Sequence, residues 1–232
     1  MNFPQAIDFL YRLQLFGAVF GLENTRRLAA LAGNPQNRLR FVHVAGTNGK
    51  GSVCAMLESV YRSAGLRTGL YTSPHLIHFG ERIQINGRRL PETDVIRLVG
   101  RMQELLAEGA LRGWWDDVFN IEDRAAGAPL PTHPTFFEVV TVMALIHFAE
   151  TDCEIVLWET GLGGRLDATN IVTPLASVIT NTTVEHAQQL GDTVTKIAAE
   201  KSGIIKPGVP VVTGVAAGPA LQVIREVAAS RG

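Results

Sequence analysis

The stretch Phe41–Ser52 reads FVHVAGTNGKGS, and it decides the fold that this sequence predicts. An apolar, β-branched run leads into a turn that contains Gly46, Gly49 and Gly51, and a helical pattern follows the turn. A strand, a glycine-rich loop and a helix in this order form the context of a phosphate-binding loop. Glycines adopt backbone angles that are closed to other residues, so successive N–H groups of such a loop can point inward at one anion.

Two side chains of the same stretch strengthen this interpretation. The helix that starts near Lys50 adds the positive end of its dipole, the lysine supplies a full charge for the β- and γ-phosphates, and the hydroxyl of Ser52 suits phosphate or metal. The match to the general pattern is imperfect, because Val44 stands at its first glycine and Gly51 at its serine or threonine. A glycine-rich turn of some other α/β protein therefore stays open as the alternative to nucleotide binding, which the context favours.

The composition narrows the class of protein. The chain has 232 residues, of which 46% are hydrophobic, and this is enough for one large α/β domain with a substantial core. A net charge of −1 without a long basic run argues against nucleic-acid binding. We expect no signal peptide and no membrane segment, because the start lacks the required pattern and no apolar run approaches about 20 residues. Cys54 and Cys153 offer no metal spacing and no disulfide framework, which favours the reducing cytoplasm.

Hydrophobic periodicity predicts helices that alternate with strands around the loop. The pattern is typical of an α/β, P-loop NTPase-like fold, with a mostly parallel sheet and helices on both faces. We expect helices over 3–16, 22–32, 50–64, 91–108, 135–149 and 193–202 and after Pro219, strands over 68–72, 155–159, 176–180 and 209–213, a hairpin with an Asn-Gly turn over 83–88, and an irregular segment over 109–134.

Four polar residues follow predicted strands, where open α/β sheets bind their ligands: Lys50, Ser73, Glu159 and His186. A carboxylate that ends an apolar strand is costly unless it meets a cation, yet by itself Glu159 is equally well a structural acid. His186 is a candidate base or metal ligand, although most loop histidines are neither, and Lys201 by default lies on a solvated helix face. Mg²⁺ prefers oxygen ligands and often spans one or two side chains and nucleotide phosphates.

At this point several motifs carry a resemblance to one family. The segments HVAGTNGKGSV, YTSPHL, ERIQING, TFFE, ETGLGGRLDATN and AAEKSGIIKPGVPVV occur in the order seen in folylpolyglutamate and dihydrofolate synthases of the Mur ligase superfamily. The likeness runs from about Tyr11 to Thr213. GTNGKGS alone points only to the superfamily, whereas GLGGRLDATN with TFFE points to the folate branch. One departure is Glu185, which stands where the family usually has an aspartate before the metal histidine.

The resemblance implies roles for particular residues. Lys201 matches a lysine that the family carries as a carbamate, and Lys50, Lys201 and His186 are the implied catalytic residues. The implied ATP loop is Thr47, Asn48, Gly49, Lys50, Gly51 and Ser52, and the implied Mg²⁺ ligands are Ser73, Glu159 and His186. The implied pterin contacts are Ala18, Val19, Phe20, Thr135, Phe136, Phe137, Glu138, Leu166, Asp167 and Ala168. In that set an aromatic ring can stack on the flat pterin, and Asp167 can accept hydrogen bonds from its N–H groups.

The resemblance also implies an activity. ATP and Mg²⁺ activate the carboxylate of dihydropteroate or folate as an acyl phosphate, and L-glutamate attacks it. We expect residues 1–232 to form the ATP-binding domain, with the Rossmann-like domain that completes the glutamate site outside this chain, so that the chain alone has impaired or no activity; the parent is expected to be monomeric. Three alternatives stay open: a Mur-type ligase for a cell-wall precursor, a nucleotide-hydrolysing switch or motor, and a nucleotide-binding module without ligase activity.

Overall fold

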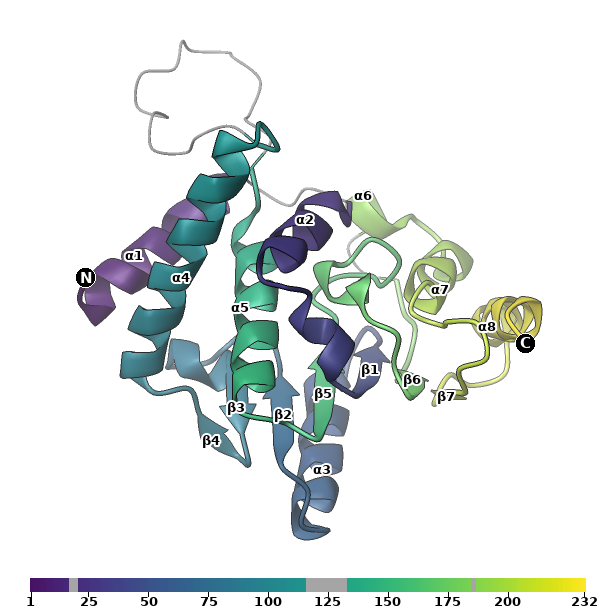
Figure 1. Ribbon diagram of the computed structural model, residues 1–232. Coiled ribbons are helices and arrows are strands. Elements are labelled where there is room, and N and C mark those ends of the chain that lie inside the picture. The colour runs from purple at the N-terminus through teal and green to yellow at the C-terminus, as the bar shows by residue number, and fades with distance from the viewer. Residues whose placement is uncertain (17–20, 116–132, 185–186) are drawn as a thin grey trace.

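A mixed sheet of seven strands lies at the centre of the described residues, and helices cover both of its faces (Figure 1). The computed structural model describes residues 1–16, 21–115, 133–184 and 187–232. The strand order is β4-β3-β2-β5-β1-β6-β7. The strands are β1 (Phe41–Ala45), β2 (Thr68–Tyr71), β3 (Ile83–Ile85), β4 (Arg88–Arg89), β5 (Ile155–Glu159), β6 (Ala176–Ile179) and β7 (Val211–Thr213).

Strand β1 occupies the middle of the parallel part of the sheet. β2, β5, β1, β6 and β7 run parallel, while β3 pairs antiparallel with β2 and β4 antiparallel with β3. In the register of these strands, Val44 lies opposite Glu159 of β5 and Val178 of β6. The three strands therefore finish at the same edge, which is where α/β sheets bind ligands. The predicted Asn-Gly hairpin is confirmed, since Asn86 and Gly87 connect β3 to β4 with φ of 51° and 71°.

The helices form two layers around this sheet, and α7 and α8 pack beside its β6–β7 end (Figure 1). The α-helices are α1 (Phe3–Arg12), α2 (Glu23–Leu31), α3 (Lys50–Ser63), α4 (Glu92–Leu111), α5 (Phe136–Glu150), α6 (Ala187–Leu190), α7 (Val194–Ser202) and α8 (Pro219–Ser230). Short 3-10 helices are η1 (Leu13–Phe16), η2 (Pro35–Arg38), η3 (Phe79–Arg82) and η5 (Ala168–Ile171).

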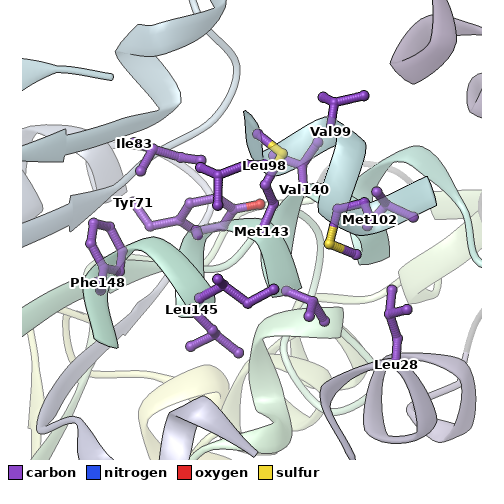
Figure 2. Packing of buried hydrophobic residues seen from close by; sticks show 14 of the residues in the cluster. Leu28, Tyr71, Ile83, Leu98, Val99, Met102, Val140, Met143, Leu145 and Phe148 are labelled. Atoms are coloured by element: carbon purple, nitrogen blue, oxygen red, sulfur yellow. The ribbon is translucent and has the colours of Figure 1, made fainter. Parts of the chain in front are cut away.

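Helix α5 is enclosed by protein on every side. Its sequence FFEVVTVMALIHFAE is apolar all round, so both its faces must be covered to keep apolar surface from water. The sheet covers one side, and α1, α2 and α4 cover the other. Figure 2 shows Tyr71 of β2 and Met102 of α4 in one cluster with Val140 and Met143 of α5. This layer contains the main core of the protein.

Helix α3 covers the opposite face of the sheet with a smaller core. Val44 of β1, Leu70 of β2 and Leu157 of β5 pack there against Cys54 of the helix. Neighbouring residues along a strand point to opposite faces, so Trp158 joins the α5 layer instead. The predicted helices on both faces of a mostly parallel sheet are thus confirmed.

Two predicted helix boundaries are wrong. The helix expected over 3–16 ends as an α-helix at Arg12, because the N–H of Leu13 bonds to Leu10 three residues back and the chain tightens into η1. The helix expected to stop at residue 108 continues to Leu111 through Gly109. That glycine serves a close contact and not a helix end, since a Cβ there would lie 1.8 Å from Cζ2 of Trp115. The part of the segment 109–134 between residues 116 and 132 lies outside the described residues.

In the described ranges, no helix combines the length and the apolar character that crossing a bilayer requires.

Candidate active site

The glycine-rich loop between β1 and α3 is anchored to the end of β6. The Oγ1 of Thr180 donates to the carbonyl of Asn48 (2.7 Å), and the N–H of Asn48 donates to Oδ1 of Asn181 (2.9 Å). Gly46 has φ of 154°, and a Cβ on it would lie 1.8 Å from Thr180 Oγ1. Gly49 has φ of 78° and precedes α3 without a side-chain cap of its own, while the N–H of Gly51 in the first turn bonds to the Glu159 carboxylate. The loop therefore has the geometry of an anion cradle.

Lys50 lies over the loop that it follows. Its Nζ donates to the carbonyls of Gly46 (3.0 Å) and Thr47 (3.2 Å), which fixes the ammonium group at the centre of the turn. Asn48, Gly49 and Ser52 are exposed, whereas Thr47 is buried and exchanges hydrogen bonds with the backbone of residue 183. The loop thus presents a cation and an exposed rim of N–H groups at the carboxyl edge of the sheet.

Glu159 ends β5 beside this loop and is only 4% exposed. Its Oε2 accepts a hydrogen bond from the N–H of Ser73 (2.9 Å), and the N–H of Gly51 also stabilises the carboxylate. Burial raises the pKa of Glu159, and the Ser73 N–H, the Lys50 charge and the Gly51 N–H oppose that rise. The structure therefore brings together Lys50, Ser73 and Glu159, three of the four residues that follow predicted strands.

A cavity of about 460 Å³ opens next to Ser73. Its walls combine apolar and aromatic side chains with a few polar groups, which is the usual character of a small-molecule site. Seven residues predicted as pterin contacts line it, together with seven others, and the full set is Gln14, Gly21, Ser73, Pro74, Arg82, Thr135, Phe136, Phe137, Glu138, Gly161, Leu162, Leu166, Asp167 and Ala168.

The two phenylalanines at the start of α5 are held by different neighbours. Phe136 stacks on Tyr11, with ring centroids 5.9 Å apart, and meets Phe79 edge to face. Phe137 lies against the loop after β5, because a Cβ on Gly161 would be only 2.5 Å from Cζ of its ring. Gly161 therefore lets the loop backbone lie flat on this ring.

Thr135 and Glu138 form a reciprocal cap of α5. The carboxylate of Glu138 accepts from the N–H (2.8 Å) and hydroxyl (3.0 Å) of Thr135 and from the hydroxyl of Thr25 (3.3 Å). Burial raises the pKa of Glu138, while its bonds to Thr135 and Thr25 oppose this. Both predicted pterin contacts therefore fix the helix start that carries Phe136.

Asp167 holds the loop after β5 in place. Its Oδ2 accepts from the N–H of Leu162 (2.8 Å), its Oδ1 accepts from the N–H (3.0 Å) and hydroxyl of Thr169, and the N–H of Gly161 adds a further bond. A carboxylate offers about four acceptor positions, so these bonds leave little capacity for a ligand. Asp167, the predicted acceptor for the pterin, thus also holds its own loop, and it lines the cavity. Burial raises the pKa of Asp167 against these hydrogen bonds.

Lys201 departs from the default of a solvated helix lysine. It lies on α7 and is 1% exposed. The loop after β5 passes directly over it, since a Cβ on Gly164 would lie 2.9 Å from the Lys201 carbonyl oxygen. Burial of this lysine was not expected from its helix sequence, because the packed loop comes from another part of the chain.

Four predicted site residues, Ala18, Val19, Phe20 and His186, lie outside the described residues. Across those that are described, no group of three or more His, Cys, Asp and Glu side chains is placed to hold a metal ion.

Arg82 is a further cavity residue, for which neither the sequence pattern nor the family resemblance implies a role. It lies in the quoted segment ERIQING, but a charged residue in a polar segment carries no local signal of burial. In the structure it is 8% exposed and its guanidinium faces the ring of Phe136.

Comparison with known proteins places this site in a family context. Residues 44–216 match the family model of the Mur ligase middle domain. The dihydrofolate synthase/folylpolyglutamate synthase of Bacillus subtilis is 42% identical over 224 residues, which cover 96% of this chain and 48% of that enzyme. The chain therefore spans about half the length of this relative.

Solved structures agree with the sequence match. A complex of FPGS with AMPPCP superposes with a TM-score of 0.87 at 32% identity and covers 100% of this chain and 52% of that one. The E. coli FolC protein in complex with DHPP and ADP gives a TM-score of 0.81 at 32% identity, covering 98% of this chain and 50% of that one.

Proposed function

Since the chain belongs to the Mur ligase family, whose middle domain it matches over residues 44–216, we propose that it is the ATP- and folate-binding part of a ligase. The ligase joins L-glutamate to the carboxylate of dihydropteroate or folate. The observation that carries this proposal is the contiguity of the phosphate loop, the buried Glu159 and the aromatic cavity, which share Ser73. The relatives named above are enzymes of this kind.

In the proposed reaction, a carboxylate oxygen of the pteroate or folate attacks the γ-phosphorus of ATP, and ADP leaves. The amine of glutamate then attacks the acyl phosphate, an amide bond forms, and phosphate and a proton are released. The protein contributes mainly position and charge to such a phosphoryl transfer. Lys50 neutralises the phosphates from the centre of the loop, and the N–H groups at the start of α3 bind their oxygens.

Magnesium fits the donors at this edge of the sheet. Mg²⁺ in nucleotide sites commonly takes one or two protein oxygens and fills its octahedron with water and phosphate. The Glu159 carboxylate and the Ser73 hydroxyl supply such oxygens, and His186 is the third proposed ligand. When bound, the ion neutralises phosphate charge. Burial raises the pKa of Glu159 despite the nearby charge of Lys50, so a bound cation would further stabilise the carboxylate.

We further propose that Lys201 carries a carbamate. The ammonium group first loses a proton, and addition of CO₂ to the resulting amine releases a second proton and gives an anionic carbamate with oxygen ligands for a second Mg²⁺. Support comes from the burial of this side chain in α7, where it is 1% exposed and not solvated.

The proposed cavity ligand is the pterin, with Phe136 and Phe137 as its aromatic walls. We propose that the glutamate site lies in a region of the whole ligase that corresponds to the half of its relatives that this chain does not match. The proposed location is the cytoplasm, where the free, buried thiols of Cys54 and Cys153 stay reduced, and the proposed state of the protein is a monomer.

The decisive experiment measures acyl phosphate formation and ATP binding together. The chain, and a protein extended to the length of its relatives, are incubated with Mg²⁺, ATP and either dihydropteroate, folate or a UDP-sugar peptide. Hydroxylamine traps an acyl phosphate as a hydroxamate, and calorimetry follows ATP. We expect hydroxamate with a pteroate or folate only.

Lys50→Ala is expected to reduce hydroxamate formation about 10²–10³-fold, because it removes the charge at the centre of the loop. Lys196→Ala, an exposed lysine of α7 that pairs with Asp192, is the matched control and should leave the rate unchanged. A hydroxamate obtained with the UDP-sugar peptide alone would replace the folate assignment, and ATP hydrolysis without any acid would refute the ligase.

A further inference from the structure

Arg82 is the one arginine among the described residues that is buried, and it faces the cavity. It ends η3, just before the antiparallel strand β3. Its backbone carbonyl accepts from the N–H of Thr72 (3.0 Å), which follows β2 and precedes Ser73. Glu159 bonds to the N–H of Ser73. The end of β2 therefore has Glu159 on one side and Arg82 on the other.

The guanidinium of Arg82 is fixed by two aromatic neighbours. Its Nε donates to Nδ1 of His75 (2.7 Å), and Cζ lies 5.2 Å from the centroid of the Phe136 ring. His75 is held in turn by the hydroxyl of Tyr11 (3.3 Å). These contacts use one N–H and one face of the guanidinium, and they determine its direction.

The remaining donors of Arg82 have no partner within the described ranges. Four N–H groups on the two terminal nitrogens form no hydrogen bond there, and no described carboxylate forms an ion pair with this arginine. By contrast, the half-exposed Arg62 donates to Glu58 (3.0 Å) on the other side of the sheet. Burial lowers the pKa of Arg82. A buried cation that lacks a counter-ion is unfavourable and marks a site for an anion.

The residues that line the cavity indicate which kind of anion fits. Phe136, Phe137, Leu162 and Leu166 provide flat and apolar walls, and Arg82 contributes the fork of donors that matches a carboxylate in a bidentate way. A ligand for this cavity is thus an aromatic body that ends in an acid. This inference rests on the proposed function, in which such an acid is activated.

We propose that Arg82 binds the carboxylate of the aromatic acid substrate and so selects acids over their neutral analogues. The carboxylate is held beside Ser73, at the border between the cavity and the phosphate loop. Arg82 is a substrate-binding residue in this scheme, with His75 and Phe136 as the groups that orient it.

Calorimetry with two ligands tests the proposal. The probes are pteroate and the analogue with a phenyl ring in place of its benzoate, measured in the absence of ATP so that no turnover occurs. We expect the wild-type protein to bind pteroate about 10- to 100-fold more tightly than the neutral analogue. In Arg82→Met this preference should fall to less than threefold while affinity for the neutral analogue is kept, and Arg82→Lys should keep only part of it. Arg101→Met, on the exposed side of α4, is the matched control and should behave as wild type.

The wild-type measurement also decides the matter if the variants fail to fold. Equal affinity for the acid and the neutral analogue in wild type, or an unchanged preference in a folded Arg82→Met, overturns the role of Arg82 and leaves the substrate class standing. Binding of neither probe by a protein that does bind ATP overturns both this role and the pterin assignment on which it rests.

Discussion

Two buried acids at the same edge of the sheet differ in how the protein treats them. Asp167 receives hydrogen bonds from three backbone N–H groups and a hydroxyl, and all of its donors belong to its own loop, residues 161–169. Glu159 accepts from two backbone N–H groups, that of Ser73 in the loop after β2 and that of Gly51 in the first turn of α3. Burial raises the pKa of both acids.

The difference distinguishes an acid whose acceptor positions are nearly all filled by its own loop from an acid that has acceptor positions left for a ligand. Asp167 is nearly saturated and closes its own loop, which fixes Gly161 against Phe137. Glu159 retains acceptor positions beside Lys50, at the point where three strands end. Loss of charge at Glu159 is therefore expected to reduce activity and not stability, and loss of charge at Asp167 to reduce stability. This contrast can be tested.

The largest effect is expected for Glu159→Gln. The amide keeps the size of the side chain but loses the charge that would bind Mg²⁺, so hydroxamate formation should fall about 10²–10³-fold. The free energy of unfolding in urea should stay the same or rise, because the native protein no longer buries a charge without a full set of partners. Glu226→Gln, an exposed acid of α8, is the control. A clear loss of stability in Glu159→Gln would make this acid structural and remove the contrast.

Asp167→Asn should show the reverse pattern. An amide can accept at one atom only, so at least two of the four donors around it lose their partner, and we expect a loss of about 3 kcal/mol in the free energy of unfolding. The equilibrium measurement is urea denaturation followed by circular dichroism. Asp192→Asn, at an exposed ion pair, serves as the matched control and should hardly change the midpoint. Full stability of Asp167→Asn would show that the loop does not depend on this carboxylate.

The smallest effect is expected in the stability at acidic pH, and it comes from His43, which forms a hydrogen bond with the Asp167 loop. Thr169 gives its hydroxyl hydrogen to Asp167, so Nε2–H of His43 must donate to Thr169 Oγ1 (2.9 Å), and Nδ1 stays unprotonated. Burial lowers the pKa of His43 from 6.5 to about 3, and the charge of Lys206 adds to this. Between these two pKa values the unfolded chain binds a proton that the folded one does not. The free energy of unfolding therefore decreases as the pH is lowered through this window.

The expected contribution is a slope of up to about 1.4 kcal/mol per pH unit between about pH 6 and 4. His43→Gln removes the titrating group, and urea denaturation at several pH values should give a shallower fall in stability than the wild type shows. The raised carboxyl pKa values of Glu159 and Asp167 work in the opposite direction and are present in both proteins. Parallel pH profiles would contradict the assignment to His43.

Features with a local signal could be predicted from the sequence. The strand before Gly46, the loop and the helix from Lys50 are a continuous pattern of apolar residues, glycines and a helix start, and all three are found where expected. The aromatic cavity gathers seven of the residues that the family resemblance implied.

Features that depend on distant packing could not be predicted. Arg82 sits in a polar segment and is buried only because Phe136 and His75 reach it from other elements. Lys201 is buried by the loop at Gly164, and Gly109 admits a tryptophan ring instead of ending a helix. Phe136 and Gly164 are distant in sequence from the residues that they cover, whereas Trp115 lies only six residues after Gly109 but folds back on the helix in a way that no periodic pattern reports.

The enclosure of α5 has a consequence for how the cavity behaves. A helix wrapped by the sheet and by three other helices exposes its backbone to water only when the whole core opens. Phe136 and Phe137 extend from its first turn, so their positions are tied to the global stability of the protein. A substitution that weakens the core at the far end of α5, around Phe148, would then lower the affinity for a bound heterocycle without changing any atom that contacts it.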